Sequence, residues 1–85
     1  MLSTFTKDGR SYNYEARLTR LGFLNLCKLQ DEIEQPYLPG DALLFAMLRD
    51  GSGNKYESIE AATDSVDIAD YGELIMAIRK SCGLT

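Results

Sequence analysis

Residues 2–17, LSTFTKDGRSYNYEAR, decide how this chain begins to fold. The dipeptide Asp8-Gly9 supplies the residue types that best tolerate the two positive φ angles of a tight type I′ turn. A two-residue loop fixes the register, so the expected cross-strand pairs are Lys7 with Arg10, Phe5 with Tyr12 and Ser3 with Tyr14. The aromatic side chains then share one face. Because an isolated hairpin is marginal in water, this face must pack on the rest of the domain or on another subunit.

The segment that follows, LTRLGFLNLCKLQDEI (18–33), carries the apolar spacing of a helix. Thr19 is a suitable N-cap, because its hydroxyl can accept a hydrogen bond from the first turn. Leu24 falls on the opposite arc, among charged residues, where a single exposed leucine is common in soluble proteins. The residues of the apolar stripe are Leu18, Leu26, Leu29 and Ile33, with Leu21 and Phe23 at its edges.

The stretch ALLFAML (42–48) has no polar side. It follows a break at Pro36 and Pro39, and Gly40-Asp41 offers a turn and an N-cap. On a helical projection Leu43, Ala46 and Met47 point one way, while Leu44, Phe45 and Leu48 point the other. The helix is either enclosed by its neighbours or presents one face to a partner, and enclosing it completely is difficult in so small a domain.

Two further helices are expected towards the C-terminus. Ser58 can cap a short helix within SIEAATDSV (58–66), and Asp70 with Glu73 matches a capping box for a last helix that stops at Gly83. The apolar stripe of the last helix comprises Tyr71, Leu74, Ile75, Ile78 and Cys82. The sequence thus predicts one α+β domain, 1–85, with an N-terminal β-hairpin (1–17) followed by a bundle of three to four short helices (18–85).

Composition argues against several classes of function. Nine basic and thirteen acidic residues leave a formal charge of -4, without a basic run that could follow a phosphate backbone, so nucleic acid is not an expected partner. The chain has no histidine, the commonest general base and zinc ligand. No glycine-rich phosphate motif or paired catalytic acid stands out. We therefore expect no enzymatic activity, no cofactor and no metal.

The cysteine pattern and the hydropathy predict a soluble, cytoplasmic protein. Cys27 and Cys82 lie far apart without a CxxC motif, which favours free thiols in a reducing compartment over a disulfide or a zinc site. The N-terminus has no apolar core of signal-peptide length. No later stretch approaches the roughly 20 apolar residues that span a bilayer, so no membrane contact is expected.

The loop RDGSGNKYESIE (49–60) resembles the start of a calcium loop, because Asp50, Ser52 and Asn54 occupy alternate positions. The sixth position of such a loop needs glycine and is Lys55 here. The twelfth needs a bidentate glutamate and is Ala61. The stretch is better explained as a helix end, a glycine-rich turn and the approach to the next helix, with a small calcium-binding module as the alternative.

The order of motifs resembles a known family. A hairpin of the form F-T-x-D-G-x-x-Y-x-Y is followed by a leucine-rich helix, by ALLFAMLRDG and by SIEAATDSVDIADYGELIMAIRKSCGL. This succession is similar to that of the small tail assembly chaperones of long-tailed bacteriophages and prophages. The resemblance implies a non-enzymatic protein that binds the tape-measure protein and tail-tube subunits during assembly, in the cytoplasm of the bacterial host.

The residues themselves favour the same class of function. An apolar helix in a small acidic domain indicates apolar contact with another chain, with solubility maintained by charge. The candidate contact residues, for a partner protein or a homo-oligomer, are Leu24, Leu43, Phe45, Met47 and Met76. A decoy that imitates nucleic acid is the weakest alternative, because the negative charge is modest and forms no stripe.

Overall fold

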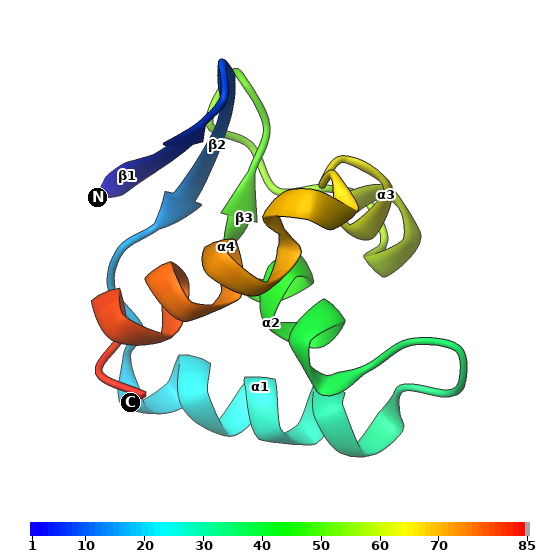
Figure 1. Cartoon of the computed structure of the whole chain (residues 1–85). Coiled ribbons are helices and arrows are strands. Elements are labelled where there is room, and N and C mark those ends of the chain that lie inside the picture. The colour runs from blue at the N-terminus through cyan, green and yellow to red at the C-terminus, as the bar shows by residue number, and fades with distance from the viewer. Residues whose placement is uncertain (85) are drawn as a thin grey trace.

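The computed structural model describes residues 1–84 and shows an α+β fold, an antiparallel hairpin followed by four helices (Figure 1). The predicted fold class is confirmed. The strands are β1 (Leu2–Lys7), β2 (Arg10–Glu15) and the short β3 (Leu48–Arg49). The helices are α1 (Arg20–Glu32), α2 (Pro39–Met47), α3 (Ile59–Asp64) and α4 (Ile68–Ser81).

The hairpin has the predicted turn and the predicted register. Asp8 and Gly9 have φ angles of 51° and 81°, as a type I′ turn requires. The paired residues include Lys7 with Arg10, Phe5 with Tyr12 and Ser3 with Tyr14. Tyr12 and Tyr14 are buried in the core, so the aromatic face of the hairpin packs on the rest of the chain.

A third strand was not predicted from the sequence. Leu48 and Arg49 leave the end of α2 and pair antiparallel with Tyr14 and Asn13 of β2, which gives a sheet of order β1-β2-β3. A strand of only two residues is too short to show the alternation of apolar and polar residues from which a strand is predicted. The pairing depends on where the end of α2 meets the hairpin, and it places β2 in the centre of the sheet and β1 at one edge.

Helix α2 is the central element of the fold. It lies between α1 and the layer formed by the hairpin and α4, and it also packs on α3 (Figure 1). Ala42 and Leu44 are completely buried, and Leu43, Met47 and Leu48 are nearly so. Of the two alternatives for ALLFAML, the structure therefore has the enclosed helix, with only Phe45 and Ala46 partly exposed.

The helix caps agree with the sequence at two positions and differ at two. Thr19 accepts a hydrogen bond from the Gly22 N–H, and Ser58 accepts one from the Ala61 N–H, as predicted. Pro39 opens α2, and Asp41 accepts a bond from the Leu38 N–H at 2.8 Å instead of forming the N-cap itself.

The predicted cap of α4 was also wrong. Asp67 is the N-cap of this helix, and Asp70 lies one turn inside it, fully buried. The reason is tertiary: Asp70 is bonded to side chains of the hairpin, so its carboxylate is not free to bond the first turn of its own helix. The predicted stop is confirmed. Gly83 has a φ of 75°, and the Leu84 N–H donates to the Arg79 carbonyl at 2.8 Å, closing the helix with a Schellman motif.

Candidate functional site

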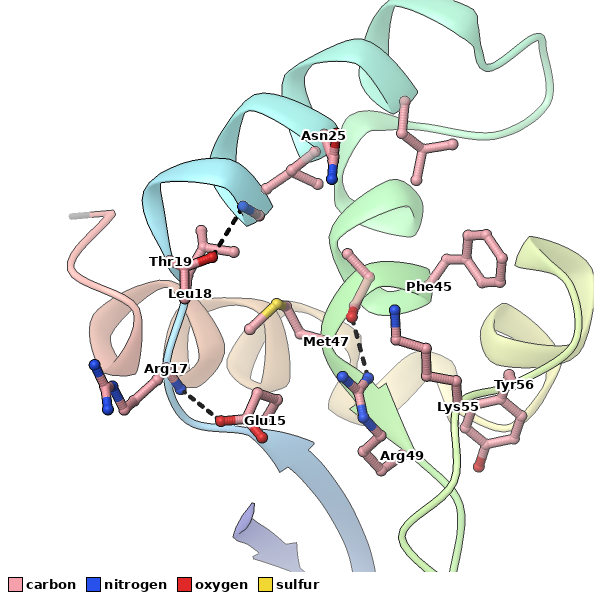
Figure 2. A pocket seen from close by; sticks show the side chains of 14 residues that line it. Glu15, Arg17, Leu18, Thr19, Asn25, Phe45, Met47, Arg49, Lys55 and Tyr56 are labelled. Carbon is pink, nitrogen blue, oxygen red and sulfur yellow. Dashed lines mark hydrogen bonds between the residues drawn. The ribbon is translucent and has the colours of Figure 1, made fainter. Parts of the chain in front are cut away.

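A cleft of about 330 Å³ opens between α1, α2 and the loop that follows β3 (Figure 2). We call it the α1–α2 cleft. It is assembled from four separate segments of the chain, so no continuous motif announces it. Its lining residues are Glu15, Arg17, Leu18, Thr19, Gly22, Asn25, Leu26, Leu29, Phe45, Ala46, Met47, Arg49, Lys55 and Tyr56.

Buried core residues form the inner wall of the cleft. Leu26 of α1 and Met47 of α2 are only 4% and 3% exposed, so the floor belongs to the hydrophobic core. Leu18 and Tyr56 pack partly against the core, and these two residues and Phe45 leave part of their surface open. Helix α1 is fixed beside the cleft by its Thr19 cap, shown as a dashed line in Figure 2. The apolar surface is therefore held by rigid elements on two sides.

The rim of the cleft is positively charged, although the whole chain is acidic. Arg17, Arg49 and Lys55 line it, and neither Arg17 nor Lys55 takes part in an ion pair within residues 1–84. Arg49 donates from Nη1 to the carbonyl oxygens of Ala46 and Leu48, at the C-terminal end of α2, where a cation is favourable. Figure 2 shows the Lys55 side chain extending from its loop towards α2.

Glu15 is the one acid among the lining residues, and its charge is already balanced. The N-terminal ammonium of Met1 lies 2.9 Å from one carboxylate oxygen and 3.0 Å from the other. This bond lowers the pKa of Glu15 below its ordinary value, with a smaller contribution from the Arg17 N–H. Glu15 also attracts Arg49 within the cleft, whereas Arg17 and Lys55 form no ion pair within residues 1–84. The site therefore favours a ligand that is apolar with acidic groups at its edge.

The structure does not bring the five sequence-predicted contact residues together. Leu43 and Met47 are 2% and 3% exposed, so they are core residues, and only an edge of each reaches a surface hollow. Phe45 lines the α1–α2 cleft beside Met47. Leu24 and Met76 are 48% and 56% exposed, on different helices and outside this cleft. Of the five, Phe45 alone offers the cleft an accessible large side chain.

The cleft residues that the sequence did not single out are Arg17, Leu18, Arg49, Lys55 and Tyr56. Leu18 was expected only as part of the α1 stripe, and Lys55 only as a residue that spoils a calcium loop. No signal in the sequence could have grouped them, because the linker before α1 meets the loop after β3 only in the folded chain.

The carboxylate at the centre of the ion pair between the hairpin and α4 is closed to ligands. Asp70 is fully buried, and its carboxylate accepts two bonds from Arg10 and one of 2.5 Å from the Tyr12 hydroxyl. The Arg10 bonds, and then the Tyr12 bond, hold the pKa of this carboxyl well below its ordinary range. Tyr12 in turn accepts a bond from the Asp67 N–H at 3.2 Å. Every partner is internal, so this network joins the hairpin to α4.

The loop at residues 50–54 is explained by its own hydrogen bonds. Asp50 Oδ1 accepts from the N–H groups of Ser52 and Asn54 at 2.8 and 2.9 Å, and Gly53 has a φ of 84°. The Asp50 N–H donates back to the Asn54 carbonyl, and the backbones of Arg49 and Lys55 form an isolated antiparallel β-bridge. The result is a tight turn after β3, and within residues 1–84 no group of three His, Cys, Asp or Glu side chains is placed to hold a metal ion.

Two smaller expectations can be compared with the structure. Cys27 and Cys82 are both free thiols, each partly buried. None of the helices within residues 1–84 is long and apolar enough to cross a membrane.

Comparisons of the chain with protein-family models, with curated proteins and with solved structures each found no match.

Proposed function

We propose that this protein is a non-enzymatic binding protein, which holds an acidic, amphipathic segment of another protein in the α1–α2 cleft. One observation carries the proposal: an apolar hollow on rigid elements, rimmed by three cations, in a chain whose net charge is -4. The partner class follows from this contrast, because apolar anchors fill the hollow while acidic neighbours meet the rim.

The size of the cleft limits what enters it. Its 330 Å³ lies at the lower end of the roughly 300–1,000 Å³ that ligand sites occupy. A few large side chains of a bound segment fit this volume. The backbone of a bound helix would not enter the cleft and would lie across its opening. Phe45 and Tyr56 then supply the aromatic contact area that dominates many protein interfaces.

The partner protein is suggested by the resemblance of the sequence to small tail assembly chaperones. Such a chaperone binds tape-measure and tail-tube subunits during assembly and does no chemistry on them. A hairpin with a helical bundle, an apolar cleft and no histidine all suit a protein of this kind. We include in the proposal that the natural ligand is a segment of a tape-measure or tail-tube protein.

Two helical peptides with identical leucine anchors test the proposal, one flanked by glutamates and the other by lysines. Fluorescence anisotropy of the labelled peptides should show tighter binding of the glutamate peptide than of the lysine peptide. Lys55→Glu should lower the affinity for the glutamate peptide and raise the affinity for the lysine peptide. Lys28→Glu makes the same charge change on the exposed side of α1, outside the cleft, and should leave both affinities unchanged.

Three results would count against this function. If neither peptide binds, an acidic, amphipathic segment is not the partner. If Lys55→Glu and Lys28→Glu change the affinities equally, the peptides are attracted by the net charge of the chain and not by the cleft. A scan of overlapping peptides from a tape-measure protein and a tail-tube protein then tests the resemblance. If only peptides without acidic amphipathic character bind, the cleft chemistry is misassigned.

A further inference from the structure

The outer edge of β1 offers free backbone hydrogen-bonding groups. Bonded and non-bonded pairs alternate along an antiparallel ladder, and the Ala16 N–H bond to the Met1 carbonyl marks one bonded pair. The alternate residues Leu2, Thr4 and Thr6 therefore direct their N–H and C=O groups away from β2. Since β1 is the first strand in the order β1-β2-β3, no strand within residues 1–84 pairs with this edge.

An apolar groove of about 680 Å³ runs beside this edge, on the opposite side of the hairpin from β3. It lies between Phe5 of β1 and one stripe of α4. Met76, in the middle of the stripe, is 56% exposed. The α4 residues of the groove are Gly72, Glu73, Met76, Ala77 and Lys80. We call the groove and the strand edge together the β1–α4 face.

Helix α4 runs antiparallel to β1, level with it at both ends. Near the turn of the hairpin, Lys7 donates to Glu73 at 2.7 Å and to the Ala69 carbonyl at 3.2 Å. At the other end Ser81 donates to the Ala16 carbonyl at 2.7 Å, beside the start of β1. The middle of β1, at Thr4, therefore lies level with the middle of the α4 stripe, between Met76 and Ala77.

The charges on the α4 stripe are complementary to a reversed copy of themselves. Glu73 lies at one end, Met76 and Ala77 in the middle and Lys80 at the other end, spaced i, i+3, i+4 and i+7 on one side of the helix. A two-fold axis between Met76 and Ala77 places Glu73 of each copy opposite Lys80 of the other. The same axis, passing Thr4, places the two β1 strands edge to edge and antiparallel.

We propose that the β1–α4 face is a two-fold interface between two copies of this chain. The β1 strands pair about Thr4 and join two three-stranded sheets into one of six strands, and the α4 stripes pack with Met76 near the axis. An interface of this kind is isologous, so a single self-complementary surface completes it. It also covers the strand edge, which otherwise exposes unpaired N–H and C=O groups to other chains. The α1–α2 cleft lies on other elements and remains open.

Sedimentation equilibrium tests the dimer. As the concentration is raised to about 0.1 mM, well above the dissociation constant of a functional dimer, the wild-type chain should reach twice the mass of one chain. Met76→Lys places two like charges beside the axis and should raise the dissociation constant at least roughly tenfold. Ile68→Lys is the matched control, because Ile68 is 86% exposed on the same helix and outside the groove, and it should leave the dimer intact.

A charge exchange identifies the geometry. Lys80→Glu should weaken the dimer, because Glu73 then faces a carboxylate of the second copy instead of an ammonium group. Because Lys7 pairs with Glu73 in the same chain, the exchange is made in a Lys7→Gln background, where the double variant Glu73→Lys with Lys80→Glu should restore the dimer. Thr4→Pro removes an outward N–H and leaves the backbone bonds between β1 and β2 in place, and it should also weaken the dimer while circular dichroism shows the fold retained. Thr4→Val is its control, because both variants lose the Thr4 hydroxyl bond to Asn13 and only the proline variant loses the N–H.

The proposal is overturned by a wild-type chain that is monomeric throughout this range. It is equally overturned by a dimer that persists in Met76→Lys, or by one that the charge exchange fails to restore, because the two copies would then meet through another surface or in another orientation. Peptide binding at the α1–α2 cleft is measured separately, so failure of the dimer proposal leaves the proposed binding function standing, and failure of the binding function leaves the dimer proposal standing.

Discussion

Arg10 donates two hydrogen bonds to the Asp70 carboxylate, from Nε to Oδ2 at 2.6 Å and from Nη2 to Oδ1 at 2.8 Å. The pair joins the hairpin to the C-terminal helix across 60 residues of sequence. Asp70 is fully buried, so its charge is tolerable only while these donors and the Tyr12 hydroxyl remain in place. The packing of the hairpin against α4 thus depends on the Asp70 carboxylate.

Acid should weaken the fold through Asp70. Its pKa lies well below the ordinary 3.8, chiefly because of Arg10 and then Tyr12. A depressed folded-state pKa means that the unfolded chain binds the proton first, so the stabilisation is complete above about pH 4 and is lost as the pH falls towards the folded-state value. The free energy of unfolding, measured by urea titration from neutral pH downwards, should therefore fall steeply below about pH 4.

The Asp70→Asn variant should be less stable at neutral pH and should lose this part of the acid dependence. Tyr12→Phe removes one of the donors and keeps Arg10, so its profile should lie between the two. If the profiles of Asp70→Asn and the wild type run parallel below pH 4, another group controls the acid transition.

The two methionines named from the sequence should behave oppositely on truncation. Met47→Ala empties part of the core and should lower the free energy of unfolding by about 2–5 kcal/mol. Met76→Ala removes an exposed side chain and should change it by no more than about 0.5 kcal/mol. Chemical denaturation of both variants at a protein concentration below the dissociation constant of the proposed dimer makes the comparison. Equal losses would mean that Met76 is buried within the single chain.

Two glycines test the hairpin turn. A Cβ at Gly9 or at Gly72 meets no atom within 4 Å, so space does not distinguish them. Gly9 has a φ of +81°, where alanine is strained, and Gly9→Ala should cost about 1–2 kcal/mol. Gly72 lies inside α4, and Gly72→Ala should stabilise the protein by about 0.5–1 kcal/mol. Chemical denaturation that shows no cost for Gly9→Ala would mean that the turn is not type I′.

Gly40 and Tyr71 should be energetically coupled. A Cβ at Gly40 would collide with the buried hydroxyl of Tyr71. Burial, and then the nearby charge of Asp41, raise the pKa of Tyr71 to about 12. Gly40→Ala should therefore destabilise the wild type by roughly 1–3 kcal/mol, and by clearly less in a Tyr71→Phe background. A double-mutant cycle with purely additive losses would exclude this contact.

The parts of the fold that were predicted correctly depend on neighbours in sequence. Asp8-Gly9 determines its own turn and hence the register, and Thr19 and Ser58 bond N–H groups only a few residues away. The errors depend on distant partners. Asp70 has the spacing of a helix cap, but Arg10 and Tyr12, which lie next to it only in the folded chain, determine its position.

The candidate site was less accessible to prediction than the fold. Met76 and Leu24 were predicted off the apolar stripes of their helices, and both are exposed. Leu43 and Met47 could not be separated from Phe45, because a helix without a polar side has no preferred buried face. The cleft itself depends on Leu18, Lys55 and Tyr56, whose proximity is a property of the tertiary structure alone.

Nuclear magnetic resonance gives the most direct test of the binding function. The glutamate-flanked peptide is titrated into the isotopically labelled full chain while the backbone amide signals are followed. The account predicts shifts that saturate and centre on Leu18, Phe45, Lys55 and Tyr56, with little change around Lys28. Saturable shifts centred elsewhere, or no shifts at millimolar peptide, would contradict the claim that this cleft is where the protein meets its partner.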